Sequence, residues 1–319
     1  MLMKILVTPA SFKPGTAGPA LEQLRSFAGD LVFNPQARPL TEDELIPLLD
    51  GCDGCIAGLD HFSRKVIEST TGTLKVISRY GTGIDNVDLA AARAKNIIVC
   101  KTPGVNAQAA ADLAFGLMLS LARQLPMLDR KTREGQWVRS VGFELYKKTI
   151  GILGLGAVGK AAARRAVGFS MKVLACDPVI DPDYAKTHGI IPVSFDELIR
   201  ESDFLSLHLP LYEETRYIIS AGVMKRMKKG SVIINTARGG VLDENAAYEL
   251  LKSGHLGGLA LDVYEKEPAE SSPLFALPNV VFTPHTAAHT IEAAAAMADL
   301  SVRNLINVLS GKECPNIVI

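Results

Sequence analysis

The stretch KTIGILGLGAVGKAAARRAVGFSMKVLACD, residues 148–177, constrains the fold more than any other part of the chain. An apolar run leads into Gly154, Gly156 and Gly159, and an alanine- and arginine-rich segment typical of a helix follows. A second apolar run ends at Asp177, near the spacing of about 20 residues at which an acid follows the glycines of a dinucleotide-binding βαβ unit. The order of strand, glycine turn, helix, strand and acid therefore favours such a unit over an ordinary glycine loop.

Each glycine of this stretch has a physical role. Gly154 permits a tight turn, Gly156 lets the backbone approach a pyrophosphate, and Gly159 lets the helix pack closely on its strand. The phosphates would then meet free N–H groups at the start of a helix. Asp177 can accept hydrogen bonds from both hydroxyls of an adenosine ribose, whereas its charge would repel a 2′-phosphate. The pattern therefore predicts NAD rather than NADP as the cofactor.

Length and charge limit the classes of protein that the chain can belong to. At 319 residues the chain exceeds what one hydrophobic core usually serves, so we expect two domains. The 34 basic residues balance 34 acidic ones without long runs of like charge, which argues against nucleic acid as a partner. The N-terminal apolar run ends at Pro9 and no apolar stretch reaches membrane-spanning length. We therefore expect a cytoplasmic protein without a membrane partner.

The cysteines fit the same compartment. Their number, five, is odd, and Cys52 and Cys55 form the only CxxC pair. One such pair is half of a zinc site, and no second pair follows. We expect these two side chains to pack in the interior, and we predict no metal site.

Strand and helix signals alternate along the chain. Before residue 101 we predict strands at 4–8, 54–57, 75–79 and 97–100, helices around 21–27, 45–49 and 63–69, and a further helix capped by residues 85–88. Residues 101–104 form the expected hinge. From residue 148 to about 285 the alternation is typical of a parallel, doubly wound sheet.

A long helix is expected at residues 107–125, closing at Pro126. It is apolar nearly all round, so we expect it to be buried between domains or subunits. An apolar face of this kind on a cofactor domain predicts a twofold homodimer.

The strand at residues 75–79 runs into Tyr80, Gly81, Thr82 and Gly83. The N–H groups of such a turn can form a nest that binds a carboxylate. An ordinary turn between a strand and a helix explains the same residues equally well. Both interpretations remain open at this point.

Three later strands end in unusual polar residues. Arg238 follows the strand at 231–235, Asp262 and Glu267 follow the strand at 258–261, and His285 follows the strand at 280–283. Because ligands of open α/β sheets bind outside the carboxyl ends of the strands, we expect these ends to share one site with the glycine turn. A cation to anchor a carboxylate, a base and an orienting acid are what hydride transfer at a 2-hydroxy acid needs. His289, four residues after His285, is interpreted as a neighbour of the base.

Five ordered stretches, SRYGTGIDNVDLAAA, GILGLGAVGKAAA, NTARGGVLDENA, ALDVYEKEP and TPHTA, resemble the D-isomer-specific 2-hydroxyacid dehydrogenase family, most closely its 3-phosphoglycerate dehydrogenases. The likeness covers roughly residues 75–290. It implies an α/β fold of two Rossmann-like, doubly wound domains. Residues 102–288 would form the NAD-binding domain, and residues 1–101 and 289–319 a substrate domain that is discontinuous in sequence. It also implies an NAD-dependent oxidoreductase acting on a small D-2-hydroxy acid.

The resemblance assigns roles to individual residues. The implied catalytic residues are Arg238, Glu267 and the acid–base residue His285. The implied cofactor contacts are Thr82 (from the other domain), Gly154, Gly156, Ala157, Val158, Gly159, Asp177, Leu209, Thr236, Ala237, Arg238, Asp262, His285, Thr286, Ala287 and Ala288. The implied substrate contacts are Arg79, Tyr80, Gly81, Arg139 and Arg238.

The resemblance is less complete at the substrate's far end. Phosphoglycerate enzymes of serine biosynthesis commonly carry an arginine after the strand that here reads CIAG, where this chain has Gly58 and Leu59. Arg79 and Arg139 match basic positions that such enzymes direct at the phosphate, so 3-phosphoglycerate is the favoured substrate. Because the chain stops at Ile319, we expect no regulatory domain and no serine feedback site.

Two alternatives remain. One is reduction of glyoxylate or hydroxypyruvate, or oxidation of another D-2-hydroxy acid. The other belongs to a different class, a corepressor that uses the same fold to sense the dinucleotide. The intact set of Arg238, Glu267 and His285 favours an enzyme.

Overall fold

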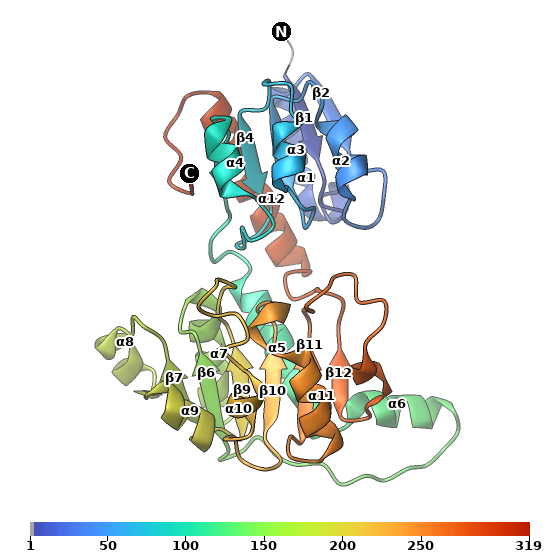
Figure 1. Ribbon diagram of the computed structural model, residues 1–319, viewed down its shortest axis with the longest axis vertical. Helices are drawn as coiled ribbons and strands as arrows, with labels where there is room; N and C mark the ends of the chain where they lie inside the picture. Colours follow the sequence, from blue (N-terminus) through green and yellow to red (C-terminus); the bar gives the residue numbers. More distant parts are fainter. Residues whose placement is uncertain (1–2) are drawn as a thin grey trace. The chain divides into compact units, whose positions relative to one another are not determined.

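The computed structural model describes residues 3–319, which divide into two compact units (Figure 1). Unit 1 comprises residues up to Asn106 and from His289 onward, and unit 2 comprises Ala107–Ala288. The sequence pattern puts the first boundary after residue 101, whereas residues 102–106 lie with unit 1. We describe each unit by itself.

Unit 1 is built on a five-stranded parallel sheet. Its strands are β1 (Lys4–Val7), β2 (Asp30–Phe33), β3 (Gly54–Ala57), β4 (Val76–Arg79) and β5 (Ile98–Cys100). They lie in the order β2-β1-β3-β4-β5, the flavodoxin-like order of doubly wound folds. Strand β2 was not predicted, because this edge strand is only four residues long and none of its residues is fully buried.

Helices cover both faces of this sheet. They are α1 (Pro14–Phe27), α2 (Glu42–Leu49), α3 (Arg64–Glu68), α4 (Leu89–Ala94) and α12 (Ile291–Leu309). Helix α4 begins where its cap predicts, because the carboxylate of Asp88 accepts the N–H of Ala91 at 2.8 Å. Helix α12 returns to the first unit near the end of the chain, and Ser78 donates its hydroxyl to the carbonyl of Ser301 at 2.8 Å. Unit 1 is therefore discontinuous in sequence.

Unit 2 contains a seven-stranded parallel sheet. Its strands are β6 (Thr149–Leu153), β7 (Lys172–Cys176), β8 (Ile190–Pro192), β9 (Phe204–Leu207), β10 (Val232–Asn235), β11 (Gly258–Leu261) and β12 (Val280–Phe282). The order β12-β11-β10-β9-β6-β7-β8 contains the strand reversal of a Rossmann fold beside β6. The prediction of two doubly wound α/β domains is confirmed.

The helices of unit 2 are α5 (Ala107–Ala122), α6 (Leu125–Arg133), α7 (Ala157–Gly168), α8 (Pro182–Thr187), α9 (Phe195–Glu201), α10 (Ala221–Met224) and α11 (Glu244–Lys252). Helices lie on both faces of the sheet, whereas α6 extends away from it (Figure 1). Two short 3-10 turns, η1 (Gly239–Val241) and η2 (Pro273–Ala276), connect them to the strands. Two clusters of buried apolar side chains fill the two sides of the sheet.

The interpretation of residues 107–125 as one helix buried between domains or subunits needs correction. Helix α5 ends at Ala122, Gln124 takes a left-handed backbone with φ 54°, and Pro126 lies in the first turn of α6 instead of closing a helix. Helix α5 packs on α7 and on the sheet, so its apolar surface is buried within unit 2. Apart from Leu125 at the start of α6, the exposed large apolar side chains of this region, including Trp137 at 85% exposure, lie after α6 in residues 134–146.

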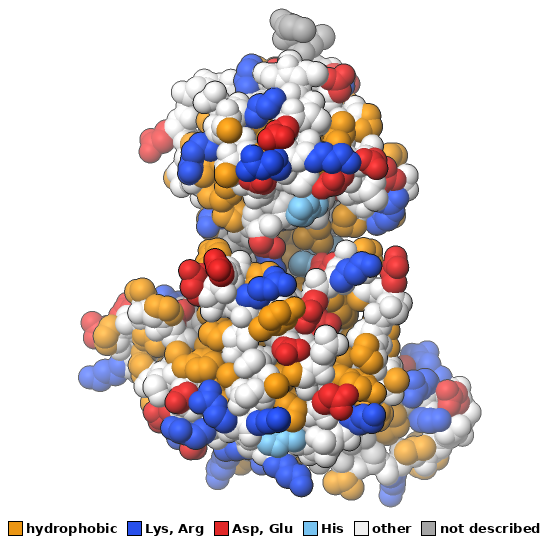
Figure 2. All heavy atoms as spheres, viewed as in Figure 1, with side chains coloured by type: hydrophobic (Ala, Val, Ile, Leu, Met, Phe, Trp, Pro, Cys, Tyr) orange, Lys and Arg blue, Asp and Glu red, His pale blue; other side chains and the backbone are white. Residues whose placement is uncertain are grey.

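Other expectations concern the interior and surface. Cys52 and Cys55 are both fully buried within one apolar cluster of unit 1. On the face that Figure 2 shows, basic and acidic side chains are interspersed. Among residues 3–319, no helix combines the length and apolarity needed to cross a bilayer.

Candidate active site

The glycine turn of unit 2 has the geometry that its sequence predicts. Gly154 follows β6 with φ +94°, in the left-handed region that favours glycine. A Cβ at Gly159 would lie 2.0 Å from the carbonyl oxygen of Gly154, so helix α7 can approach the turn this closely only with glycine there. A Cβ at Gly156 would meet nothing within 4 Å, which leaves open space beside the start of α7. No side chain caps α7, so the N–H groups at its start point toward this space.

Asp177 lies directly after β7. One of its carboxylate oxygens accepts the N–H of Leu155 at 2.7 Å and the other accepts the N–H of Val179 at 2.9 Å. Each oxygen keeps further lone pairs for ribose hydroxyls. The residues up to Asp183 include two further acids and no basic residue that could pair with a 2′-phosphate.

Two buried polar atoms at neighbouring strand ends lack a hydrogen-bond partner among the described residues. They are Nδ1 of His208, after β9, and Oγ1 of Thr236, after β10. His208 places its Nε2 2.9 Å from the hydroxyl of Ser206, and burial lowers the pKa of the imidazole to about 4, so the ring is neutral at pH 7. A buried polar atom without a partner is costly unless a ligand satisfies it. These atoms, the space at Gly156 and the carboxylate of Asp177 together fit a bound dinucleotide.

His208 was missed in the sequence, although it follows a buried strand of the same sheet. The carbonyl of His208 would lie 2.8 Å from a Cβ at Gly154, so this residue packs directly against the glycine turn. Leu209, a predicted cofactor contact, has its side chain against the same position. Polar residues after every strand of the sheet, and not only after the last three, were the signal that could have found His208.

Arg238 extends from the end of β10 and is half-buried. The side chain of Asn235 shapes this turn, because it accepts the N–H of Ala237 at 3.0 Å and donates to the carbonyl of Arg238 at 2.8 Å. The guanidinium of Arg238 donates to the carbonyl of Ala237 at 2.7 Å. A Cβ at Gly239 would lie 1.9 Å from the carbonyl carbon of Tyr264, so the turns after β10 and β11 are in direct contact.

Asp262 organises the turn that carries His285. It is fully buried, and one carboxylate oxygen accepts the hydroxyl of Thr283 at 2.6 Å and the N–H of Thr286 at 2.8 Å. The other oxygen accepts the N–H of Ala287 at 2.9 Å. Through these hydrogen bonds Asp262 fixes the conformation of the turn, which ends at Ala288, the last residue of unit 2. Its predicted contact with the cofactor stays a prediction, as does the same role for Thr286, Ala287 and Ala288.

Glu267 and His285 form an ion pair that links the ends of β11 and β12. Oε2 of Glu267 lies 2.7 Å from Nδ1 of His285, with both side chains partly exposed. His285 itself has φ 51°, a left-handed backbone that is uncommon for a residue with a side chain. Because a carboxylate only accepts hydrogen bonds, Nδ1 carries the proton and Nε2 is the nitrogen that can exchange a proton with a substrate. Three predicted catalytic residues are thus brought to adjacent strand ends.

The predicted residues of unit 1 surround the turn after β4. Tyr80 is buried and donates its hydroxyl to the carbonyl of Ala294 at 2.9 Å, so its side chain connects the turn to helix α12. Thr82 is exposed, and its hydroxyl contacts the carbonyl of Thr102 at 3.2 Å. The N–H of Thr102 donates to the carbonyl of Gly81 at 3.0 Å. The turn is therefore tied to the segment that leads out of the unit.

Arg79 is the least exposed of the predicted substrate residues, at 2%. Its Nη1 donates to the carbonyls of Ala57, at 2.5 Å, and of Gly58, and its Nε donates to the carbonyl of Gly83 at 3.1 Å. Its Nη2 would lie 3.7 Å from a Cβ at Gly81. Arg79 therefore holds the turn through these hydrogen bonds and places a positive charge next to Gly81. This arrangement does not favour Arg79 as a free-standing phosphate clamp.

Arg139 is exposed in the segment between α6 and β6 of unit 2. Among residues 3–319 no cluster of His, Cys, Asp and Glu side chains could hold a metal ion. The imidazole, the carboxylate and the guanidinium at the ends of β10, β11 and β12 offer acid–base and electrostatic chemistry.

Comparison with known proteins agrees with this geometry. Residues 115–287 match the family model described as D-isomer specific 2-hydroxyacid dehydrogenase, NAD binding domain. A glyoxylate reductase from Korarchaeum cryptofilum is 38% identical over 88% of this chain and 86% of its own length. A D-3-phosphoglycerate dehydrogenase from Methanocaldococcus jannaschii is 40% identical over 88% of this chain and 54% of its own length, so the chain spans about half of that enzyme.

A solved structure is also similar. The apo structure of a D-lactate dehydrogenase from Escherichia coli superposes with a TM-score of 0.86, at 34% identity, covering 99% of this chain and 100% of that chain. Members of the matched family are oxidoreductases that act on CH–OH donors. The chain therefore belongs to the D-isomer-specific 2-hydroxyacid dehydrogenase family and binds NAD.

Proposed function

We propose that the protein interconverts a D-2-hydroxy acid and the corresponding 2-keto acid at the ends of β10, β11 and β12. The observation that carries this proposal is the contact of 2.7 Å between Glu267 and Nδ1 of His285. Bound NAD supplies the hydride acceptor, and NADH the hydride donor. Nε2 of His285 takes the hydroxyl proton during oxidation and returns it to the carbonyl oxygen during reduction. Glu267 stabilises the imidazolium that forms, and Arg238 binds the substrate carboxylate.

For the substrate we propose 3-phosphoglycerate, oxidised to 3-phosphohydroxypyruvate as in serine biosynthesis. The relative from M. jannaschii, 40% identical, is a D-3-phosphoglycerate dehydrogenase. The exposed side chain of Arg139 supports an anionic tail. A charge-assisted hydrogen bond to such a tail contributes about 1.5–3 kcal/mol, tenfold or more in affinity.

A second candidate is reduction of glyoxylate or hydroxypyruvate. The specific observation in its favour is the burial of Arg79, whose Nη1 and Nε already donate to backbone carbonyls. Gly58, where phosphoglycerate enzymes carry an arginine, adds no charge. The relative from K. cryptofilum is a glyoxylate reductase of similar length.

One panel of 2-keto acids distinguishes these candidates. The rate of NADH oxidation is measured with phosphohydroxypyruvate, hydroxypyruvate, glyoxylate, pyruvate and a sulfonated analogue. On the proposed assignment phosphohydroxypyruvate has the highest kcat/KM, and Arg139→Ala reduces that preference without affecting glyoxylate. If hydroxypyruvate or glyoxylate is preferred, the phosphate assignment is wrong and the second candidate holds. No turnover with any member, together with normal NADH binding, would leave only a sensing role.

We also propose a homodimer in the cytoplasm. The exposed apolar side chains of residues 134–146, among them Trp137 and Val141, supply the apolar surface that this requires. In this proposal Arg139 reaches the substrate of the partner subunit. Sedimentation velocity at micromolar concentration is expected to give a dimer, and Trp137→Ser with Val141→Ser to shift it toward monomer. A wild-type monomer at that concentration would contradict the proposal.

A further inference from the structure

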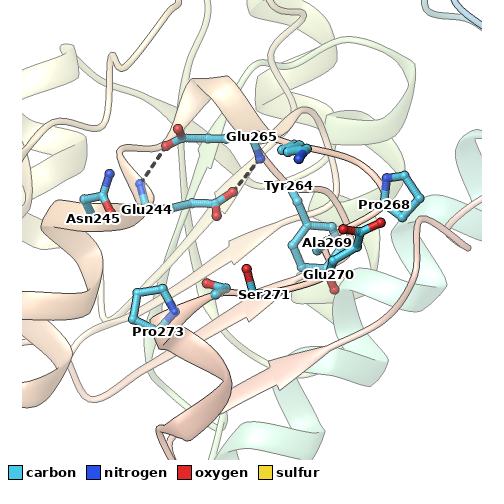
Figure 3. Close-up of a pocket in the computed structure, with 11 residues that line it drawn as sticks. Glu244, Asn245, Tyr264, Glu265, Pro268, Ala269, Glu270, Ser271 and Pro273 are labelled. Atoms are coloured by element: carbon cyan, nitrogen blue, oxygen red, sulfur yellow. Dashed lines mark hydrogen bonds between the residues drawn. The ribbon is translucent and has the colours of Figure 1, made fainter.

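Glu244 and Glu265 form a reciprocal pair of hydrogen bonds, and Glu265 lies two residues before Glu267 (Figure 3). Glu244 is the first residue of α11, and Glu265 follows β11 by a few residues. The N–H of Glu265 donates to Oε1 of Glu244 at 2.7 Å, and the N–H of Glu244 donates to Oε1 of Glu265 at 3.0 Å. Each carboxylate therefore binds the backbone of the other residue. The pair joins the start of α11 to the segment that carries Glu267.

This segment is held at successive positions. The hydroxyl of Tyr217 donates to Oε2 of Glu265 at 3.0 Å. The N–H of Tyr264 donates to Oε1 of Glu267 at 3.1 Å, and the hydroxyl of Tyr264 donates to the carbonyl of Thr283 at 2.8 Å. Glu267 then contacts His285 through its other oxygen. Glu244 is thus linked to the acid–base residue by hydrogen bonds at Glu265, Tyr264 and Glu267, which the backbone of this segment joins.

The pairing is electrostatically unfavourable, which makes a purely incidental contact a poor explanation. Burial, and after it the negative charges of Glu265 and Glu267, raise the pKa of Glu244 to about 7, although the hydrogen bond from the N–H of Glu265 acts in the opposite direction. The other titratable or charged groups on this side are Tyr264, Lys266 and Glu270 along the same segment, and Tyr217 across from Glu265. Two carboxylates placed together at a cost require a compensating gain.

Helix capping does not account for Glu244. Asp243 is already the N-cap of α11, and its side chain accepts the N–H of Ala246 at 2.9 Å. On its other side, Glu244 borders a cavity of about 190 Å³ whose wall includes Tyr264 and Glu270 (Figure 3). A shorter side chain at 244 would therefore be accommodated without a clash, but would release the N–H of Glu265.

We propose that Glu244 is a positioning residue for the His285–Glu267 pair: through its reach to the N–H of Glu265, it holds the segment after β11 so that Glu267 contacts Nδ1 of His285. The function of Glu244 in this proposal rests on the proposed dehydrogenase activity. Its structural part, protection of the Glu265 N–H, does not depend on that activity. What matters is the length of the side chain and a carbonyl-type acceptor, rather than the charge.

Three variants separate reach from charge. Glu244→Gln keeps the reach and an acceptor oxygen but removes the charge, Glu244→Asp keeps the charge but shortens the reach, and Glu244→Ala removes both. The matched control is Glu197→Ala, an exposed acid in the first turn of α9 in the same unit. Because both acids lie at helix starts, the control accounts for loss of a favourable helix-dipole interaction.

The measurements are kcat and KM for 2-keto acid reduction, and hydrogen–deuterium exchange of the peptide covering residues 262–270. We expect Glu244→Asp and Glu244→Ala to lower kcat about tenfold to a hundredfold, with KM for NADH unchanged, and to speed exchange of this peptide. Glu244→Gln and Glu197→Ala should retain wild-type values. If Glu244→Ala does not fold, Glu244→Asp and Glu244→Gln still decide the question.

Other outcomes overturn the inference. A Glu244→Asp enzyme with the wild-type kcat and wild-type exchange would show that the length of this side chain is irrelevant. A Glu244→Gln enzyme as impaired as Glu244→Ala would assign the effect to charge. If the wild-type protein turns over no 2-keto acid, the proposed function fails, while exchange at residues 262–270 still reports whether Glu244 holds the segment.

Discussion

Oε2 of Glu267 lies 2.7 Å from Nδ1 of His285, while Oε1 of the same carboxylate accepts the N–H of Tyr264 at 3.1 Å. One carboxylate therefore orients the imidazole and is itself oriented by the backbone of its own segment. The buried carboxylate of Asp262 fixes the neighbouring turn through Thr286 and Ala287. The acid–base residue is thus held from two sides, which is the preorganisation that proton transfer requires.

Replacing Glu267 by Gln should slow 2-keto acid reduction, because His285 donates the proton and the glutamine no longer offers a negative charge to the imidazolium. At pH 7 we expect a loss of at least about tenfold in kcat/KM, with NADH affinity unchanged. Steady-state rates measure kcat/KM, and fluorescence titration measures the NADH affinity. A variant with the wild-type kcat/KM would show that the pair does not contribute to proton transfer.

Asp177 should make the protein prefer NADH over NADPH by at least about tenfold in Kd, or 1.4 kcal/mol. The reason is repulsion between this carboxylate and a 2′-phosphate, in a segment to Asp183 that offers no basic residue. Fluorescence titration with both reduced cofactors measures the ratio. Asp177→Ala should narrow it, and equal affinities in the wild-type protein would contradict the prediction.

Gly156→Ala should fold normally but bind NADH at least about tenfold more weakly. A Cβ at this position meets no protein atom within 4 Å, so the change is accommodated by the fold but occupies the space that the phosphates need. Gly168→Ala, at the other end of α7, also meets nothing within 4 Å and is the control. Calorimetric titration and circular dichroism separate affinity from folding. Equal NADH affinity in the two variants would place the phosphates elsewhere.

Glu244→Gln should gain stability relative to the wild-type protein as pH rises from 5 to 8. The pKa of Glu244 is raised to about 7 in the folded state, mainly by burial, so the folded state binds this proton more tightly than the unfolded state does. That stabilising contribution is complete below about pH 4.5 and is lost as pH rises through 7. After allowance for partial exposure, the expected gain is about 1–2 kcal/mol in the free energy of unfolding.

Urea unfolding followed by circular dichroism at pH 5 and pH 8 measures this gain, with Glu197→Ala as the control. A difference between Glu244→Gln and the wild-type protein that stays constant from pH 5 to pH 8 would mean that Glu244 is ionised throughout.

The sequence by itself determined the features that arise from local rules. The turn at Gly154 depends on the backbone freedom of glycine, and the start of α4 depends on one hydrogen bond from the Asp88 side chain. The strand that ends at Asn235 depends on an apolar run. Neighbouring residues in the sequence specify all three features. Since parallel strands end at one edge of a sheet, the meeting of Glu267 with His285 also followed from their places after two strands.

Only the tertiary structure decided how distant residues use their polar groups. The sequence predicts that Arg79 contacts the substrate and Asp262 the cofactor, and the fold brings backbone groups close to both side chains as hydrogen-bond partners. From the sequence we expected the apolar surface of α5 to contact another domain or subunit, but α7 and the sheet bury this surface within its own unit. Burial and hydrogen-bond partners of this kind depend on contacts between residues that are far apart in the chain. Sequence periodicity shows which face of a helix or strand is apolar, but it does not show which part of the protein covers that face.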